Sequence, residues 1–205
     1  MFESSWKRCW TSIEAQGPGA QLMGRLIQAY GEPQRKYHTI QHLEECLNLF
    51  EQHISCAQES GEVEMALWFH DAVYSIRRSD NEEKSAEWAV DELKKAGVRP
   101  ERIDRVRAHI LATRHSALPK GRDQELLVDI DLSILGADAQ RFEEYERQVR
   151  EEYCYVPGFL FRRNRKKLLA QFLARSPIYA VPELREQLEE GARRNIMASI
   201  ERLGG

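Results

Sequence analysis

Hydrophobic residues recur at intervals of three and four positions along most of this chain, which is the spacing of one face of an α-helix. The first three segments of this kind hold the following apolar positions: Trp6, Cys9, Trp10 and Ile13; Leu22, Leu26, Ile27 and Tyr30; Ile40, Leu43, Leu47 and Phe50. Each stripe can pack on a core while the intervening positions face solvent. The first quarter of the chain is therefore predicted to form three amphipathic helices.

Glycine and proline residues indicate where the later helices begin and end. Gly97 stands where a left-handed glycine commonly follows a helix, and Pro100 suits the first turn of the next one. Asp80 or Asn81 is expected to cap the segment that runs to Ala96. These signals predict helices over residues 62–72, 81–96, 100–113, 123–135, 138–153, 157–174 and 182–203.

The sequence contains no alternating β-branched run bounded by turn residues, which is the usual signal of a strand. A chain of 205 residues is long enough for one substantial core and marginal for two. We therefore expect an all-α fold class, a single-domain bundle of roughly eight to ten helices of ordinary length.

The composition is that of an ordinary soluble protein, with 42% hydrophobic and 31% charged residues and a net charge of −3. Without a net positive field, we expect neither a nucleic acid polymer nor a membrane as partner. The first residues lack the apolar stretch of a secretory signal, which favours a cytoplasmic location. The four cysteines are widely spaced, so we expect buried free thiols and no zinc site built on cysteines.

Candidate chemistry begins with the stretch WFHDAVY, where an apolar run ends in the adjacent pair His70 and Asp71. Further histidines and acids occur in three other helical segments: His38 and His42, four residues apart and expected on one helical face; His115; and Asp129 and Asp131. One such residue alone would most simply be a helix cap or a core histidine. Imidazole and carboxylate groups together suit divalent ions such as Mn, Fe, Co, Ni or Zn. The set therefore predicts a metal site assembled from several helices.

This order of residues resembles the HD-domain superfamily of metal-dependent phosphohydrolases, whose signature is a His, then a His–Asp pair, then a distant Asp. The resemblance implies that His42, His70, Asp71 and Asp131 are the metal ligands. Asp131 is preferred to Asp129 because DLSIL looks like the Asp-led helix of cyclic nucleotide phosphodiesterases, and Asp129 is the alternative. The chain would then be one HD-type domain, with a metal-site core at about residues 36–136 and C-terminal helices 138–203 packed on it.

Seven short stretches extend the resemblance to one bacterial subgroup of predicted metal-dependent HD phosphohydrolases: RKYHTIQH, WFHDAVY, NEEKSAEWA, ILATRH, DIDLSILG, YERQVREEY and GARRNI. The match runs from about residue 20 to the C-terminus. It implies hydrolysis of a small phosphate ester or anhydride, with a nucleotide as the favoured substrate, by water activated on Mn, Fe, Co, Ni, Zn or Mg. The subgroup does not define the substrate, and the chain could form a homodimer.

Three further residues receive roles from the same resemblance. Glu82 is the candidate base that orients the attacking water beside Asp71, although VYSIRRSD separates it from the His–Asp pair. Acids at a helix start also favour the helix dipole, so a structural role for Glu82 is the alternative. His38 and His115 are candidates for binding the substrate phosphate; His38 could equally be a residue of the helix start, and His115 could bind a second metal.

Two other functions are compatible with this residue set. One is a non-catalytic HD-fold module that senses a nucleotide or supports a partner. The other is a di-iron oxygenase, which would need His38 and His115 as extra ligands. Glycine-rich nucleotide loops and a GxSxG motif do not occur, which argues against P-loop enzymes, kinases and α/β-hydrolases.

Overall fold

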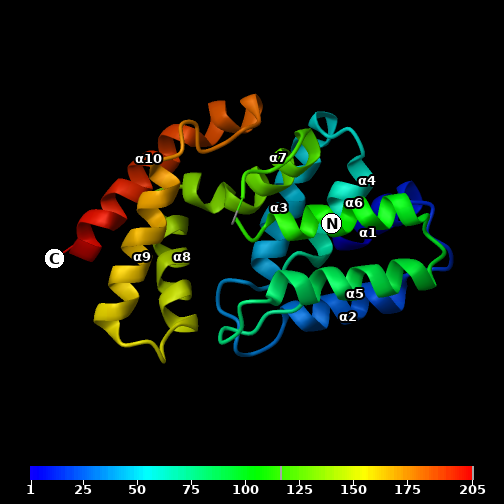
Figure 1. Ribbon diagram of the computed structural model, residues 1–205, viewed down its shortest axis with the longest axis horizontal. Helices are drawn as coiled ribbons and strands as arrows, with labels where there is room; N and C mark the ends of the chain where they lie inside the picture. Colours follow the sequence, from blue (N-terminus) through cyan, green and yellow to red (C-terminus); the bar gives the residue numbers. More distant parts are fainter. Residues whose placement is uncertain (116, 205) are drawn as a thin grey trace. The chain divides into compact units, whose positions relative to one another are not determined.

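The computed structural model describes residues 1–115 and 117–204, which form ten α-helices and two short 3₁₀ helices (Figure 1). Within these described ranges there is no β-strand, so the predicted all-α fold is confirmed. Contacts divide the chain into two compact units, Met1–Ile130 and Asp131–Gly205. The expected single HD-type domain stays a prediction.

The first unit holds the helices α1 Phe2–Ser12, α2 Ala20–Tyr30, α3 Ile40–Gln52, η1 Ile54–Cys56, α4 Ser60–Phe69, α5 Asn81–Lys95, α6 Pro100–Ala112 and most of α7 Arg122–Asp131. Most of these bounds lie within two or three residues of the expected ones. The main difference is that α4 ends at Phe69, so His70 and Asp71 follow the helix instead of lying inside it.

Helix α4 is the centre of the first unit, because all nine residues from Gly61 to Phe69 are buried. It packs against α1, α3, α5 and α6. Helices α4 and α1 leave no room for a side chain at Gly61, because a Cβ added there would overlap the Ser12 side chain. A larger residue at position 61 would therefore push α1 away from the core.

The two ends of α5 show how local residues define the bounds of a helix. Gly97 has φ +70°, and the N–H of Val98 donates to the Leu93 carbonyl at 3.0 Å, which together form the Schellman ending predicted for α5. Of the two expected caps, Asp80 and Asn81, the N-cap of α5 is Asp80, but its side chain makes no capping hydrogen bond. Its carboxylate accepts instead from Arg78, at 2.7 and 2.6 Å.

The second unit holds η2 Leu132–Gly136, α8 Ala139–Glu152, α9 Gly158–Leu173 and α10 Pro182–Gly204. Helix α10 packs on both η2 and α9. A Cβ at Gly136 would lie 2.7 Å from the backbone carbonyl oxygen of Leu188, so these two segments touch through backbone atoms. The Asn195 side chain of α10 adds to this contact by donating hydrogen bonds to the carbonyls of Leu135 and Ala137, at 2.9 and 2.8 Å.

Among the residues that the structure describes, none of the helices combines the length and the apolar character needed to cross a bilayer. Three of the cysteines, Cys9, Cys46 and Cys56, are buried free thiols as predicted, whereas Cys154 is exposed.

Candidate metal centre

His42 is placed by the start of α3. Thr39 is the N-cap of this helix, and its hydroxyl accepts the N–H of Gln41 at 3.3 Å. His42 follows in the first turn and is 2% exposed. A buried imidazole needs partners for its polar nitrogens, so the His42 ring must find them among other protein atoms.

The start of α3 also corrects one prediction. His38 was expected to share a helical face with His42, but it lies before the helix because the cap at Thr39 has extended backbone angles, φ −113° and ψ −176°. The His38 ring stacks on Tyr74 with 4.1 Å between ring centroids, and it lies 6.1 Å from the His42 ring. His38 is therefore beside the cluster through tertiary packing and not through helical spacing.

His70 and Asp71 leave the end of α4 with their backbone held. The His70 Nδ1 lies 2.8 Å from the Leu67 carbonyl oxygen, which can only accept, so Nδ1 is the protonated nitrogen. In the neutral ring the lone pair is then on Nε2, the nitrogen that faces His42. The backbone N–H of Asp71 donates to the Tyr30 hydroxyl at 3.2 Å.

Three side-chain atoms converge at this place. His42 Nε2 lies 3.1 Å from His70 Nε2 and 3.5 Å from Asp71 Oδ2, and His70 Nε2 lies 3.2 Å from the same oxygen. The two imidazoles are buried, and the Asp71 side chain is 15% exposed. The three potential donor atoms thus form a nearly equilateral triangle, of which only the Asp71 corner belongs to a partly exposed side chain.

These distances fit a shared metal ion. Two atoms that bind one ion at about 2.1 Å lie about 3.0 Å apart at a right angle and about 3.4 Å apart at the tetrahedral angle. All three sides of the triangle fall close to this range. Two imidazole nitrogens and a carboxylate oxygen are also donors that borderline divalent ions prefer. The residues present therefore fit a divalent metal.

The electrostatics of Asp71 are unusual for a carboxylate in this position. Burial raises the pKa of the Asp71 carboxyl, but the neighbouring His70, His38 and His42 outweigh burial and hold that pKa well below its usual range. The Tyr30 phenol nearby has a pKa raised by burial and by the Asp71 charge. Tyr30 is thus a neutral hydroxyl that can accept the Asp71 N–H.

Cys46 belongs to the same group and was overlooked by the sequence analysis, which assigned the cysteines to the core. His42, Cys46 and His70 are all buried, and each offers a donor atom within 4.8 Å of the others, so this group could hold a metal ion. The sulfur lies 3.8 Å from both ring nitrogens of His42. Equal distances place it beside the ring and not in line with either lone pair. The signal was the i, i+4 spacing from His42.

Glu82 lies in the first turn of α5 and is half-buried. Burial raises its pKa, and the charges of Asp71 and Glu83 raise it further. Its neighbour Glu83 instead forms an ion pair with Arg114 at the end of α6. The two adjacent acids therefore have different surroundings.

His115 follows α6 and has the left-handed φ of +53°. Its backbone N–H donates to the Ala112 carbonyl at 3.3 Å. A non-glycine residue in this conformation costs about 1–2 kcal/mol, so surrounding contacts must hold it there. Its substrate-binding role stays a prediction.

Asp129 and Asp131 fall on the two sides of the division between units. Asp129 is 2% exposed and belongs to the first unit, and Asp131, the last residue of α7, opens the second. Within the second unit, burial raises the pKa of the Tyr145 phenol and the Asp131 charge adds to that rise, whereas Arg165 lowers it. The preference for Asp131 as the fourth ligand stays a prediction.

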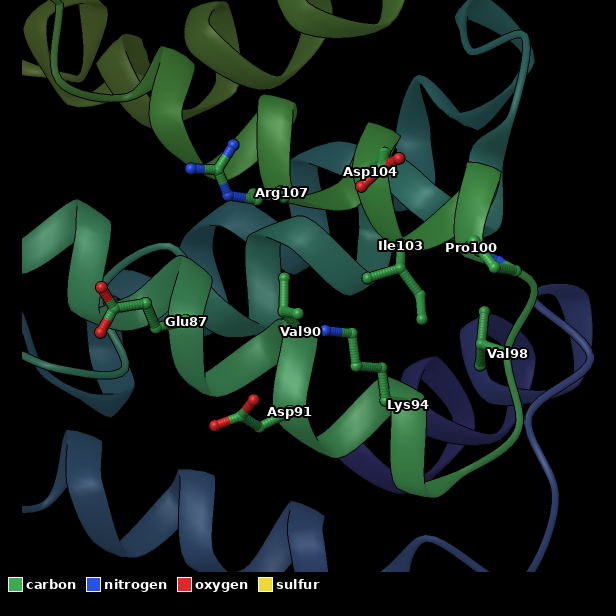
Figure 2. A pocket seen from close by; sticks show the side chains of 9 residues that line it. All are labelled: Glu87, Val90, Asp91, Lys94, Val98, Pro100, Ile103, Asp104 and Arg107. Atoms are coloured by element: carbon green, nitrogen blue, oxygen red, sulfur yellow. The ribbon is translucent and has the colours of Figure 1, made fainter.

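A separate open groove lies between α5 and α6 in the first unit, with a volume of about 630 Å³ (Figure 2). Val90, Val98 and Ile103 form its apolar part, and charged residues of both signs surround them. The groove contains none of the predicted site residues, so the candidate chemistry is elsewhere.

Comparison of the chain with models of protein families, with curated proteins and with solved structures finds no match. The resemblance to HD phosphohydrolases therefore rests on the residues quoted above and stays a prediction. The geometry itself supports the coarser statement that this is an all-α protein with a buried group able to hold a metal.

Proposed function

We propose that this protein is a metal-dependent phosphohydrolase that acts on a small phosphate ester or anhydride, with a nucleotide as the favoured substrate. The observation that supports this most is the convergence of His42, His70 and Asp71 within 3.1–3.5 Å of one another at one edge of a buried cluster. Asp131 is the proposed fourth ligand, because of its place in the HD signature.

The divalent metal would lower the pKa of a coordinated water and polarise a phosphoryl oxygen. The chain's own residues have the remaining tasks. Glu82, with its raised pKa, is the proposed base: its carboxylate accepts one proton from the attacking water. The water oxygen forms the new bond to phosphorus, and the bond from phosphorus to the leaving oxygen breaks. His38 and His115 are the proposed contacts to the phosphate.

The comparison of two adjacent acids tests this assignment. Glu82 is in the field of Asp71, whereas Glu83 pairs with Arg114. In Glu82→Gln we expect kcat to fall by about 10²–10⁴-fold while bound metal is unchanged, because a positioned base contributes that much. Glu83→Gln should keep most of the activity. The measurement is phosphate release from nucleoside mono-, di- and triphosphates and from a bis-phenyl phosphodiester, with each of the six candidate metals added.

Two results would contradict the proposal. Metal-loaded wild-type protein that releases phosphate from no substrate of the panel would favour the non-catalytic binding module. Equal activity of Glu82→Gln and wild type would remove Glu82 from the proposed mechanism.

A further inference from the structure

Arg35 is a cation buried next to the candidate metal centre. It lies in the segment between α2 and α3, and its side chain has 0% exposed surface. The Glu32 carboxylate accepts from its Nε at 3.1 Å, and the Glu32 side chain is itself 43% exposed. Burying a charged guanidinium costs its hydration free energy, so Arg35 needs further hydrogen-bond acceptors inside the protein.

Those acceptors are backbone carbonyls of two separate segments. One terminal nitrogen of Arg35 donates to the carbonyl of Asp71 at 2.6 Å and to that of His38 at 3.2 Å. The other donates to the carbonyl of Ala72 at 3.0 Å. Carbonyls just beyond a helix end lack intrahelical partners, so Arg35 satisfies those that follow α4. It thereby ties the segment before α3 to the turn after α4.

Two tyrosine rings enclose the same guanidinium. Its central carbon lies 5.3 Å from the ring centroid of Tyr30 and 5.5 Å from that of Tyr74. Tyr30 also accepts the N–H of Asp71 at 3.2 Å, and Tyr74 stacks on His38. The backbone of Asp71 is therefore held on both sides, at its N–H by Tyr30 and at its carbonyl by Arg35.

The direction of the Asp71 carboxylate depends on this backbone. Its Oδ2 must reach the two imidazole nitrogens at 3.2 and 3.5 Å, and a small rotation of the turn would carry it away. We infer that Arg35 is the positioning residue of the metal centre: it sets the affinity for the metal by fixing the Asp71 turn, without touching metal or substrate. This inference rests on the proposed function.

Arginine is required at this place for a geometric reason. The planar guanidinium offers five donors in a fixed fork and can stack between two rings. Lysine offers a single ammonium, which has neither the second terminal nitrogen that donates to Ala72 nor a planar face that can stack between the two rings. Because the Arg35 side chain is wholly buried and directed at backbone carbonyls, a direct contact with substrate phosphate is excluded in this arrangement.

The test compares Arg35→Lys with Arg105→Lys. Arg105 is the matched control, because it also donates to a buried group of the first unit, the Glu62 carboxylate near the start of α4 at 2.7 Å, and not to the turn after α4. Affinity for Co²⁺ is measured by calorimetric titration, the coordination geometry by the visible Co²⁺ absorption, and the fold by circular dichroism and urea unfolding. Arg35→Lys should bind Co²⁺ about 10–100-fold more weakly, with altered absorption, as expected when a group that orients a ligand is lost.

Arg105→Lys should keep the wild-type affinity and absorption even where its stability is equally reduced. If Arg35→Lys fails to fold, Tyr30→Phe replaces it, because that change removes only the hydroxyl on the other side of the Asp71 peptide and should weaken Co²⁺ binding in the same direction. Wild-type Co²⁺ affinity and absorption in the folded Arg35 variant, or in Tyr30→Phe where it is used instead, would overturn the inference and leave the proposed function standing. Wild-type protein that binds no metal would overturn both.

Discussion

The two ends of α4 both bury carboxylate groups, but they neutralise them differently. Near its start, Glu62 accepts from Arg105 at 2.7 Å through both oxygens, and Glu64 accepts from Arg8 at 2.6 and 3.0 Å. Beyond its end, Asp71 faces imidazole rings, and among the described residues no arginine or lysine side chain contacts its carboxylate. One end has permanent cations from the chain itself, and the other does not.

The difference indicates which end of α4 could bind a cation from solution. A buried carboxylate with an arginine partner is complete, because the pair is neutral and its hydrogen bonds are made. Two imidazoles can supply positive charge only by binding protons, or they can share a bound cation with the carboxylate. The nearly equal spacing of the three donor atoms fits a shared cation. The arginine nearest to Asp71, Arg35, is directed at its backbone carbonyl and leaves the carboxylate available.

The largest expected effect concerns the end with arginine partners. Glu64→Ala should lower the free energy of unfolding by about 3–5 kcal/mol, because it leaves a cavity in the buried helix α4 and removes the buried carboxylate to which Arg8 donates. Ser5 loses its acceptor at 2.6 Å as well. Urea unfolding followed by circular dichroism measures the change. A loss under about 1 kcal/mol would show that this pair behaves like a surface ion pair, and would remove the contrast between the two ends.

The next largest expected effect is stabilisation by metal at the site that follows the end of α4. A metal at about 100 times its dissociation constant should stabilise the wild-type protein by about 2.7 kcal/mol, since it binds the folded state alone. His70→Ala should lose this stabilisation, and excess EDTA should abolish it in the wild type. His109→Leu is the matched control, because His109 is another buried histidine, 6% exposed, outside the cluster. Thermal unfolding with and without metal gives the answer; an equal shift in His70→Ala would contradict the assignment.

The smallest expected effect is a pH dependence of stability caused by His109, a core histidine outside the candidate site. Burial lowers the pKa of His109 in the folded protein; the Asp123 charge raises it, and the Arg105 charge lowers it. The unfolded chain, with a histidine pKa of about 6.5, then binds more protons than the folded protein as the pH falls through that value. Stability should therefore decrease from pH 7.5 to 5.5.

His109→Leu should reduce this decrease when urea unfolding is measured at both pH values in the presence of EDTA. An unchanged dependence on pH would assign the effect to other groups. Neither ring nitrogen of His109 has a hydrogen-bond partner among the described residues, which agrees with a neutral imidazole.

Much of the fold could be predicted because its signals are local. Apolar spacing, the Schellman glycine Gly97 and the first-turn proline Pro100 are read within one or two helical turns, and the helices they predict are present. The start of α3 was placed wrongly in relation to His38, because Thr39 as a cap depends on backbone angles that residue spacing does not reveal. Glu62 and Glu64 would normally indicate a solvent face, yet both are buried by arginines from other helices.

For the candidate site, the sequence allowed prediction of the residues that carry the donor atoms but not of the residues that hold them in place. His42, His70 and Asp71 were recognisable as a motif, and Cys46 was overlooked although it is one turn from His42. The support around them depends on tertiary contacts: Arg35 and Asp71 are 36 positions apart, and Tyr30 and Asp71 are 41 apart. No periodic pattern encodes such contacts. The phosphohydrolase activity and the cytoplasmic location stay predictions.

The central claim is that His42, His70 and Asp71 together bind one divalent cation. The most direct measurement is elemental analysis of wild-type protein and Asp71→Ala, each incubated with Mn²⁺, Co²⁺ or Zn²⁺ and then desalted. The account predicts about one equivalent of metal in the wild type and its loss in the folded variant. Equal metal in both proteins, or none in either, would contradict it and leave His70 and Asp71 with a structural role at the end of α4.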